Sequence, residues 1–415
     1  MRIAVVGSGI AGMASAWLLS REHEVVLFEA DGRLGGHTDS HNVELDGTAL
    51  VVDSGFIVFN EKHYPLLTRL FDELGVAAQP TTMSFSVHDE ASGIQYNAGN
   101  LRGLFCQPAN LLSPRFLGML ADLRRFYRDA PAVLDLPEPG PSLGEYLAAN
   151  GYGDAFRDLH LVPMASALWS SPTARILDFP ITHLVRFMAN HSMMQLSGRP
   201  AWRVVTGGSR SYIDAFKRTW NVQVRLDSPV RSIRVQQQPT VVSVTTDVGV
   251  ESFDRVVLTC HADDALRLLA EPSDAQREVL SAFEFQDNDT ILHTDASLLP
   301  PNRGAWAAWN VHVPAQPGND CTVSYWMNAL QSLHTRDPLV VTLNRRADID
   351  PARILRERRY RHPVQSAESV QAQSRRREIQ GVDGVSYAGA WWGHGFHEDG
   401  LRSAVEVAAQ LGVSW

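Results

Sequence analysis

Cysteine, lysine and long apolar runs are all scarce in this chain of 415 residues. The three cysteines, Cys106, Cys260 and Cys321, lack the spacing of a metal site, which indicates reduced thiols, no bound metal and a cytoplasmic protein. No run of about 18 apolar residues is present, so no helix is expected to span a membrane. The apolar stretch at the N-terminus is short and interrupted by glycines, unlike a secretory signal.

Positive charge is carried almost wholly by arginine. Lys62 and Lys217 are the two lysines, so 35 of the 37 basic residues are arginine. The net charge of −9 argues against nucleic acid as a partner. The hydrophobic content of 44% and the charged content of 20% are typical of a globular protein, and the length allows two domains.

The first 37 residues contain the most specific pattern. An apolar strand at 3–6 leads into the segment GSGIAG (7–12), then a helix, and then a second strand at 24–28 that ends in Glu29. This is the glycine-rich turn of dinucleotide-binding βαβ units in its full context. Gly7 permits the tight turn, Gly9 lets the backbone approach a pyrophosphate, and Gly12 lets the helix pack closely on the strand.

The groups expected to hold the dinucleotide follow from that context. The helix N-terminus at Ile10 and Ala11 offers free N–H donors and a positive dipole end to the phosphates. The Glu29 carboxylate is placed to accept hydrogen bonds from both ribose hydroxyls. A strand–turn–helix without a ligand would leave the spaced glycines and the terminal acid unexplained.

A second glycine turn indicates which dinucleotide binds. Ala30, Arg33, Gly35, Gly36 and His37 follow the second strand. This segment resembles the second signature of an FAD-binding superfamily that includes amine oxidases and phytoene desaturases. In that superfamily the glycine pair passes close to the pyrophosphate and the ribityl chain, which favours FAD over NAD as the cofactor. The family pattern often ends in arginine, where this chain has His37.

Two further segments are expected near the cofactor. Asp53 and Gly55 lie at the end of an apolar strand, where an acid and a glycine suit a close approach of backbone to ligand, although a simple hairpin turn fits equally well. The resemblance to the superfamily implies that the backbone of Val230 contacts the adenine.

The C-terminal block repeats the order of strand, glycine loop and helix. Residues 385–389 lead through a Gly- and His-rich loop into a helix that ends near residue 411. In the resembling superfamily the N-terminus of this helix points at the flavin pyrimidine and stabilises its negative charge. The expected cofactor residues here are Glu398, Asp399, Gly400 and Leu401. Ala390 stands where many relatives have an acid, and Asp399 could serve in its place.

Nearly the whole chain resembles bacterial FAD-binding oxidoreductases of this superfamily, some of which are linked to fatty-acyl desaturation in furan fatty acid synthesis. The resemblance rests on the segments VDSGFIVFN (52–60), VPMASALWS (162–170), GGSRSYIDAF (207–216), LHTD (292–295), AAWN (307–310), YWMNALQ (325–331) and GFHEDGLRSA (395–404). It implies an α/β fold with a discontinuous Rossmann-type FAD-binding domain (1–80, 203–270 and 375–415). An α+β substrate-binding domain built on an antiparallel sheet is expected from 81–202 and 271–374.

The resemblance implies an FAD-dependent oxidoreductase, and the residues favour one reaction over another. An amine oxidase of this fold usually places a lysine near flavin N5, yet residues 271–370 contain no lysine. Desaturation of an apolar lipid or fatty-acyl substrate by hydride transfer to N5 is therefore the first interpretation, and a flavin amine oxidase the second. A non-catalytic flavin-binding protein and a nicotinamide dehydrogenase are further alternatives. The electron acceptor, whether oxygen, a quinone or another protein, stays open.

The candidate catalytic groups are His293, Asp295 and His397, with Glu398 beside them. A histidine titrates near neutral pH and suits a proton acceptor, although each could equally be a hydrogen-bonded structural residue. Large apolar side chains of the second domain could line a channel, or could simply be core: Trp169, Phe187, Met188, Met193, Met194, Trp306, Trp309 and Trp326.

Residues 101–128 mix leucine and phenylalanine with five arginines, Arg102, Arg115, Arg124, Arg125 and Arg128. Such a stretch could lie peripherally on the inner membrane and admit an acyl chain. The alternative is an amphipathic helix pair that packs on its own domain.

Overall fold

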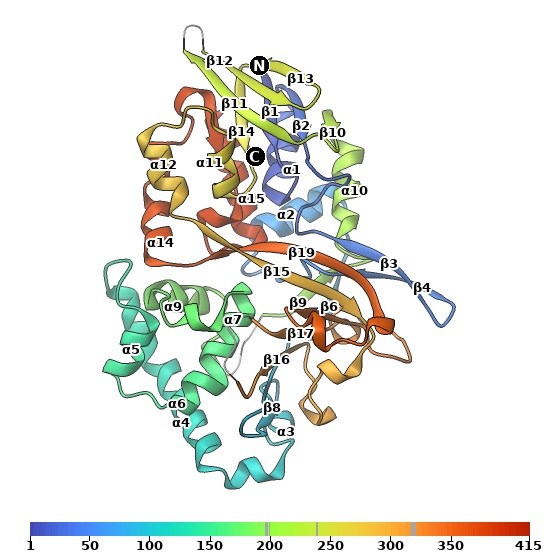
Figure 1. Cartoon of the computed structure of the whole chain (residues 1–415), viewed down its shortest axis with the longest axis vertical. Helices are drawn as coiled ribbons and strands as arrows, with labels where there is room; N and C mark the ends of the chain where they lie inside the picture. The colour runs from blue at the N-terminus through green and yellow to red at the C-terminus, as the bar shows by residue number, and fades with distance from the viewer. Residues whose placement is uncertain (196–197, 199, 238–239, 317–320) are drawn as a thin grey trace.

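The computed structural model describes residues 1–195, 198, 200–237, 240–316 and 321–415. Its two main sheets lie one above the other along the long axis of the molecule (Figure 1). A five-stranded sheet lies towards the N- and C-termini, a seven-stranded sheet crosses the middle, and helices form the opposite end. The expected fold class, a parallel α/β sheet joined to a mainly antiparallel sheet, is confirmed.

The five-stranded sheet is parallel throughout, in the order β10-β2-β1-β14-β20. Its strands are β1 (Arg2–Val6), β2 (Glu24–Phe28), β10 (Val222–Arg225), β14 (Arg255–Leu258) and β20 (Val385–Tyr387). The central strands are nearly continuous apolar runs because both faces of the sheet are covered. All five strands come from the three segments expected for the cofactor domain.

Alternate residues of β1 enter two different cores. Ile3 and Val5 pack on the face covered by helices, whereas Ala4 and Val6 pack on the other face. The helices of the first face are α1 (Ile10–Leu19), α2 (Pro65–Leu74), α10 (Arg210–Thr219) and α15 (His397–Gln410). The other face is covered by the meander β11 (Val230–Gln237), β12 (Thr240–Thr246) and β13 (Gly249–Phe253), with α11 (Ala262–Leu268), α12 (Asp274–Ser281) and α14 (Ala367–Ser374).

The seven-stranded sheet has the order β19-β15-β18-β17-β16-β7-β8. Its strands are β7 (Phe85–Asp89), β8 (Gln95–Asn97), β15 (Glu284–His293), β16 (Trp309–Val313), β17 (Val323–Trp326), β18 (Val340–Leu343) and β19 (Ile354–Val364). All neighbours are antiparallel except β16 and β7, which are parallel. The sheet is therefore mixed rather than purely antiparallel. In the chain, β7 precedes the helices of residues 101–190 and β16 follows them, so a long crossover connection and no hairpin joins these two parallel strands.

Helices between β8 and β9 (Trp202–Val205) form the end of the molecule farthest from the parallel sheet (Figure 1). They are α3 (Leu101–Leu104), α4 (Pro114–Asp129), α5 (Leu143–Ala149), α6 (Asp154–Phe156), α7 (Val162–Trp169), α8 (Thr173–Ile176) and α9 (Ile181–Asn190).

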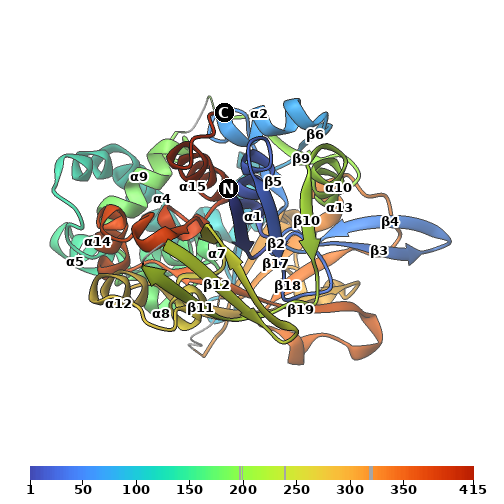
Figure 2. The same cartoon turned by 90° about the horizontal axis from the view of Figure 1, so that it is seen from above.

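Smaller elements join the two main sheets. The hairpin β3 (Ser40–Leu45) and β4 (Thr48–Asp53) projects from the body of the molecule (Figure 2). A three-stranded sheet pairs β9 (Trp202–Val205) with β5 (Val58–Phe59) and β6 (Ala78–Thr81). The short helix α13 (Met327–Gln331) follows β17.

The turn between β1 and α1 leaves no room for side chains. Gly7 has a φ of +103°, a conformation that other residues rarely adopt. A Cβ atom on Gly12 would lie 1.9 Å from the Gly7 carbonyl oxygen and 2.6 Å from Thr259 Oγ1. The first turn of α1 is thus packed directly against the backbone of the β1 turn and against β14.

Replacing Gly12 with alanine should destabilise the fold. The added methyl group has to push the helix away from the turn, which we expect to cost about 1–3 kcal/mol of unfolding free energy. The matched control is Gly118→Ala, since Gly118 is exposed on α4 with no atom near its Cβ position and should gain about 0.5–1 kcal/mol. Urea unfolding followed by circular dichroism measures both, and equal stabilities of the two variants would contradict this packing.

Candidate active site

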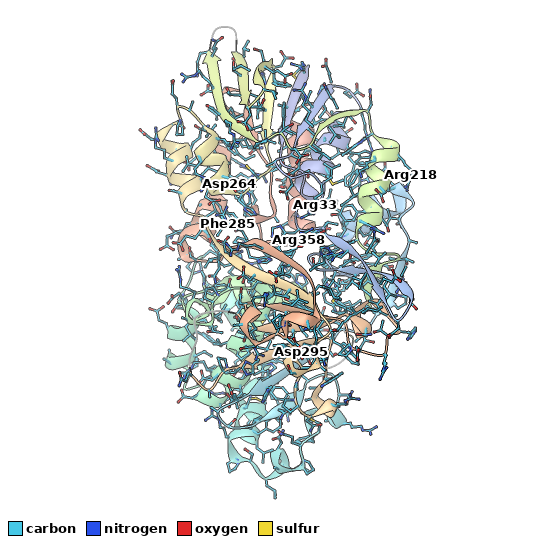
Figure 3. All side chains as sticks on the ribbon, turned by 45° about the vertical axis from the view of Figure 1, so that its right-hand side comes forward. Arg33, Arg218, Asp264, Phe285, Asp295 and Arg358 are labelled. Carbon is cyan, nitrogen blue, oxygen red and sulfur yellow. The ribbon has the colours of Figure 1, made fainter. Side chains whose placement is uncertain are left out.

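A cavity of about 1650 Å³ runs from the parallel sheet to the seven-stranded sheet. One end is lined by the glycine turns after β1 and β2, and the other by apolar side chains of the second sheet and its helices. Strand β19 lines the cavity between these ends. Figure 3 shows Arg33, from the second glycine turn, and Arg358, from β19, near each other between the two halves of the molecule.

The nucleotide end of the cavity presents backbone donors. Helix α1 starts at Ile10 after Gly9, and no side chain caps its free N–H groups. A Cβ atom on Gly9 would meet nothing within 4 Å, so this turn faces open space. An uncapped helix N-terminus beside open space fits a pyrophosphate.

Glu29 is fixed at the end of β2 by three hydrogen bonds. Its Oε2 accepts from the Ser8 backbone N–H at 2.9 Å and from Ser8 Oγ at 2.5 Å, and its Oε1 accepts from the Asp31 N–H at 2.9 Å. The carboxylate lies in the cavity wall, where its remaining lone pairs can accept ribose hydroxyls.

The second glycine turn is built around a close backbone contact. Gly35 and Gly36 have φ values of +117° and +55°, and a Cβ atom on Gly36 would lie 3.1 Å from Gly9 Cα. Arg33 braces the turn by donating to the carbonyl oxygens of Gly36 at 2.8 Å and Thr38 at 3.1 Å. The two glycine turns therefore meet with no side chain between them.

Neutral histidines line the middle of the cavity. His37 Nε2 donates to the Arg361 carbonyl oxygen at 3.0 Å, and burial lowers the pKa of His37 to about 4. His397 stacks on Phe56 with ring centroids 3.8 Å apart. Burial lowers the pKa of His397 to about 3, so both rings are uncharged at neutral pH.

The far end of the cavity is apolar. Its lining includes Phe85, Met164, Leu168, Trp169, Trp309 and Tyr325. Of the side chains expected to form a channel, Trp169, Phe187, Met193 and Trp309 line this space, whereas Met188, Met194, Trp306 and Trp326 do not. Met188 is instead fully buried in the helical core because α9 turns it away from the cavity.

Most of the cofactor residues expected from the sequence meet at the cavity. These are Gly7, Gly9, Ile10, Ala11, Glu29, Ala30, Arg33, Gly35, Gly36, His37, Gly55 and Val230. Gly12 lies behind them in the helix–strand contact. Gly55 is also a close-approach position, since its Cβ atom would lie 1.8 Å from the His37 carbonyl oxygen.

Asp53 differs from its expected position and does not line the cavity. Its side chain is fully buried and accepts hydrogen bonds from the Ser209 N–H at 3.0 Å, Ser40 Oγ at 2.5 Å and Gln331 Nε2 at 3.1 Å. Burial raises the pKa of Asp53 to about 6. Its role here is to tie the β4 end to the start of α10 and to α13.

The residues at the start of α15 also differ from expectation. Glu398 accepts from the Leu66 and Leu67 N–H groups at 2.9 and 3.0 Å, and so caps α2. Asp399 accepts from the His394 and Phe396 N–H groups, both at 3.1 Å, and holds the preceding loop. Gly400 and Leu401 pack inside the protein, with the Gly400 Cβ position 2.9 Å from Ile10. The cavity is reached from this helix by His397, with Phe396 just before it.

His293 and Asp295 lie outside the cavity lining. His293 is fully buried; its Nδ1 accepts from the Asp295 N–H at 3.0 Å and its Nε2 lies 2.7 Å from Thr342 Oγ1. Asp295 accepts from the backbone N–H groups of Ser297 and Asp350, both at 3.0 Å. Both side chains organise the end of β15, so the structure places these two candidate catalytic residues away from the cavity.

Several cavity residues were not expected from the sequence, chiefly His261, Tyr360 and His362. Two of them lie on β19, whose segment ILRERRYRHPV is too rich in arginine to be predicted as a strand. The alternation of Arg358, Tyr360 and His362 was the available signal, since it places every second residue on one face.

One group of possible metal ligands occurs in the described part of the chain. Ligand atoms of His261, Asp263 and Asp264 all lie within 4.8 Å of one another. Both carboxylates already pair with arginine, Asp263 with Arg361 and Asp264 with Arg267 and Arg361. These guanidinium groups neutralise the negative charge of the two carboxylates, so the group does not favour a bound cation.

The Glu29→Gln substitution should weaken FAD binding by about tenfold or more. The carboxylate uses both oxygens for separate donors, and an amide offers one acceptor oxygen only, which forfeits a hydrogen bond to a charged group. Titration of the apoprotein with FAD, followed by quenching of flavin fluorescence, measures the affinity. Glu22→Gln is the control because Glu22 is exposed in the turn before β2. Wild-type affinity in Glu29→Gln would show that this carboxylate does not hold the cofactor.

Comparison with solved structures supports the fold at full length. The chain superposes on a conjugated-linoleic-acid (CLA)-producing fatty acid isomerase from P. acnes with a TM-score of 0.69 and 15% identity, covering 99% of each chain. It superposes equally well on putrescine oxidase bound to putrescine, with a TM-score of 0.70, 13% identity and 99% of each chain covered. At these identities the likeness concerns the fold alone.

Sequence comparison identifies the family. The carotenoid phi-ring synthase of Streptomyces griseus is 26% identical over 288 residues, which is 65% of this chain and 54% of that protein. The match thus spans about half the length of this curated relative. The family model described as flavin-containing amine oxidoreductase matches residues 10–288, more than half of the chain. The chain therefore belongs to the flavin-containing amine oxidoreductase family.

Proposed function

We propose that this enzyme desaturates a long apolar substrate, a lipid or fatty-acyl chain. When bound, FAD supplies the acceptor for the hydride that leaves one substrate carbon. A proton leaves the neighbouring carbon, so that a carbon–carbon double bond remains. We assign His397 as the acceptor of this proton, because it is the one expected catalytic residue that lines the cavity.

The observation that carries this proposal is the composition of the far end of the cavity. The carboxylates of the lining, Glu29, Asp31, Asp264 and Glu357, lie after β2, on α11 and on β19. Within the described residues, β7, α7, α9, β16 and β17 contribute no acidic or lysine side chain to the lining. An alkyl chain is stabilised there by the burial of apolar surface, whereas an ammonium group would be desolvated without a counter-ion.

A flavin amine oxidase is the alternative, and the family name itself favours it. Two adjacent tryptophans, Trp391 and Trp392, could form an aromatic cage for an amine or could be packing residues. Their rings pack on Phe283 with centroids 4.7 and 5.4 Å away, which favours packing. Trp391 also lines the cavity, but it belongs to the core on the meander side of the parallel sheet.

Anaerobic flavin bleaching with phospholipids and with alkylamines should separate the two reactions. We expect unsaturated, cyclopropane or methyl-branched acyl chains to reduce the flavin in the dark, and amines not to. Leu168→Trp fills the apolar end and should lower the apparent second-order rate of reduction by about tenfold or more, since overpacking costs about 1–3 kcal/mol. Leu226→Trp, at an exposed site, should have no effect.

Reduction by an amine but by no lipid would replace the proposal with the amine oxidase. If neither lipids nor amines reduce the flavin, while light still does, a non-catalytic flavoprotein would be favoured.

We propose that such a substrate enters the cavity from a membrane surface. Four leucines on α3, α4 and the turn between them are exposed: Leu101, Leu111, Leu112 and Leu117, with Leu112 86% exposed. Arg102 and Arg115 lie among them, and neither pairs with a carboxylate in the described part of the chain. Exposed leucines beside arginines suit the interface of an anionic bilayer. In the same described ranges, no helix is both long and apolar enough to cross a membrane.

The Leu111→Ser/Leu112→Ser double variant should lose flotation with anionic vesicles at low salt. Each serine removes a side chain that would insert between lipid chains, so we expect most of the bound fraction to be lost. The control is Val248→Ser/Val250→Ser, which removes two exposed apolar residues at the opposite end of the molecule. Wild-type protein that stays wholly unbound would refute the membrane contact.

A further inference from the structure

His362 lies in the cavity wall where the nucleotide end passes into the apolar end. It is on β19, two residues after Tyr360, and its ring centroid is 5.1 Å from that of His37. His37 follows directly on the Gly35-Gly36 turn, and both histidines line the cavity. If the dinucleotide binds at the glycine turns and the substrate at the apolar end, the redox ring of the cofactor would lie at this junction, because a hydride passes only between groups in contact.

Two asparagines hold the His362 ring. Asn288, fully buried on β15, donates from Nδ2 to His362 Nδ1 at 3.0 Å. Asn344 donates from its own Nδ2 to Asn288 Oδ1 at 2.7 Å and to the Cys321 carbonyl oxygen at 3.0 Å. The Asn344 Oδ1 in turn accepts from the Asp289 N–H at 2.9 Å.

This chain of hydrogen bonds sets the tautomer of the imidazole. The Asp289 N–H can only donate and the Cys321 carbonyl can only accept, so they fix which end of the Asn344 amide donates. Asn344 then requires the Asn288 oxygen to accept, and Asn288 is left to donate to His362. His362 Nδ1 is therefore the acceptor, and the ring proton is on Nε2.

The ring is also kept neutral. Burial, together with the neighbouring His37 and His261, holds the pKa of His362 well below its usual value. Among the described residues no acceptor is recorded for the Nε2–H group. A neutral donor without a protein partner in a cavity wall is available to a ligand.

We propose that the His362 Nε2–H donates a hydrogen bond to the redox ring of the flavin and stabilises the negative charge that the ring gains on reduction. Asn288 and Asn344 are positioning residues that act through His362. A preorganised donor strengthens as negative charge develops, so it raises the reduction potential. The inference rests on the bound flavin of the proposed function, but not on which substrate is oxidised.

The reduction potential of the purified holoprotein, measured by equilibration with a redox dye without any substrate, tests this role. We expect His362→Ala to shift the ratio of reduced to oxidised flavin about tenfold towards the oxidised form, which is about 30 mV for a two-electron couple. His362→Gln keeps an N–H donor and should stay closer to the wild type. His88→Ala is the control, since His88 lies outside the cavity beside His312, and it should cause no shift.

A wild-type potential in His362→Ala that retains FAD would overturn the proposal. If that variant loses FAD, Asn288→Leu decides, because it removes the group that sets the tautomer and leaves the imidazole in place. A wild-type potential in Asn288→Leu would then overturn the proposal, whereas a lowered potential supports it.

The tautomer is read independently from ¹⁵N chemical shifts of histidine-labelled protein, with His362 assigned by its loss in His362→Gln. A proton on Nε2 supports the assignment, and a proton on Nδ1 refutes it. Because neither measurement involves substrate, failure of this inference stays distinct from failure of the lipid desaturase proposal.

Discussion

The close approach of two glycine turns is the constraint on which the rest of the molecule depends. The Gly36 Cβ position lies 3.1 Å from Gly9 Cα, and the Gly12 Cβ position lies 1.9 Å from the Gly7 carbonyl oxygen. Backbone donors can converge on a pyrophosphate only if no side chain separates them. Helix α15 completes this contact from the far end of the chain, because Gly400 packs on Ile10.

The second feature of the site is the boundary between the two main sheets, where β19 lies. Strand β19 is an edge strand of the seven-stranded sheet, and it supplies Arg358, Tyr360 and His362 to the cavity. The Arg358 guanidinium donates to Asp39 at 2.7 Å, which links this edge to the segment after the second glycine turn. This boundary thus brings the hydrogen-bonding groups of β19 to the part of the cavity between the glycine turns and the apolar end.

Local patterns predicted the nucleotide end well because its chemistry is local. Gly7, Gly9, Gly36 and Glu29 each act through their own backbone or through a neighbour in the same βαβ unit. The candidate catalytic residues were predicted less well, since His397 lines the cavity and His293 and Asp295 do not. His293 occurs in a segment shared with the resembling proteins. Successive side chains of β15 point to opposite faces of the sheet, and this places the His293 ring in the core against Thr342 rather than in the cavity.

The sequence by itself indicated that a dinucleotide binds, favoured FAD over NAD as this dinucleotide, and assigned the N- and C-terminal segments to one expected domain. These conclusions needed only turn conformations and the short-range order of strands and helices. Tertiary structure alone decided that Glu398 caps α2, that Asp53 holds α10, and that β19 lies at the cofactor cavity. The physical reason is that a buried carboxylate or imidazole takes its function from its hydrogen-bond partners, and here those partners are up to about 330 residues away in the chain.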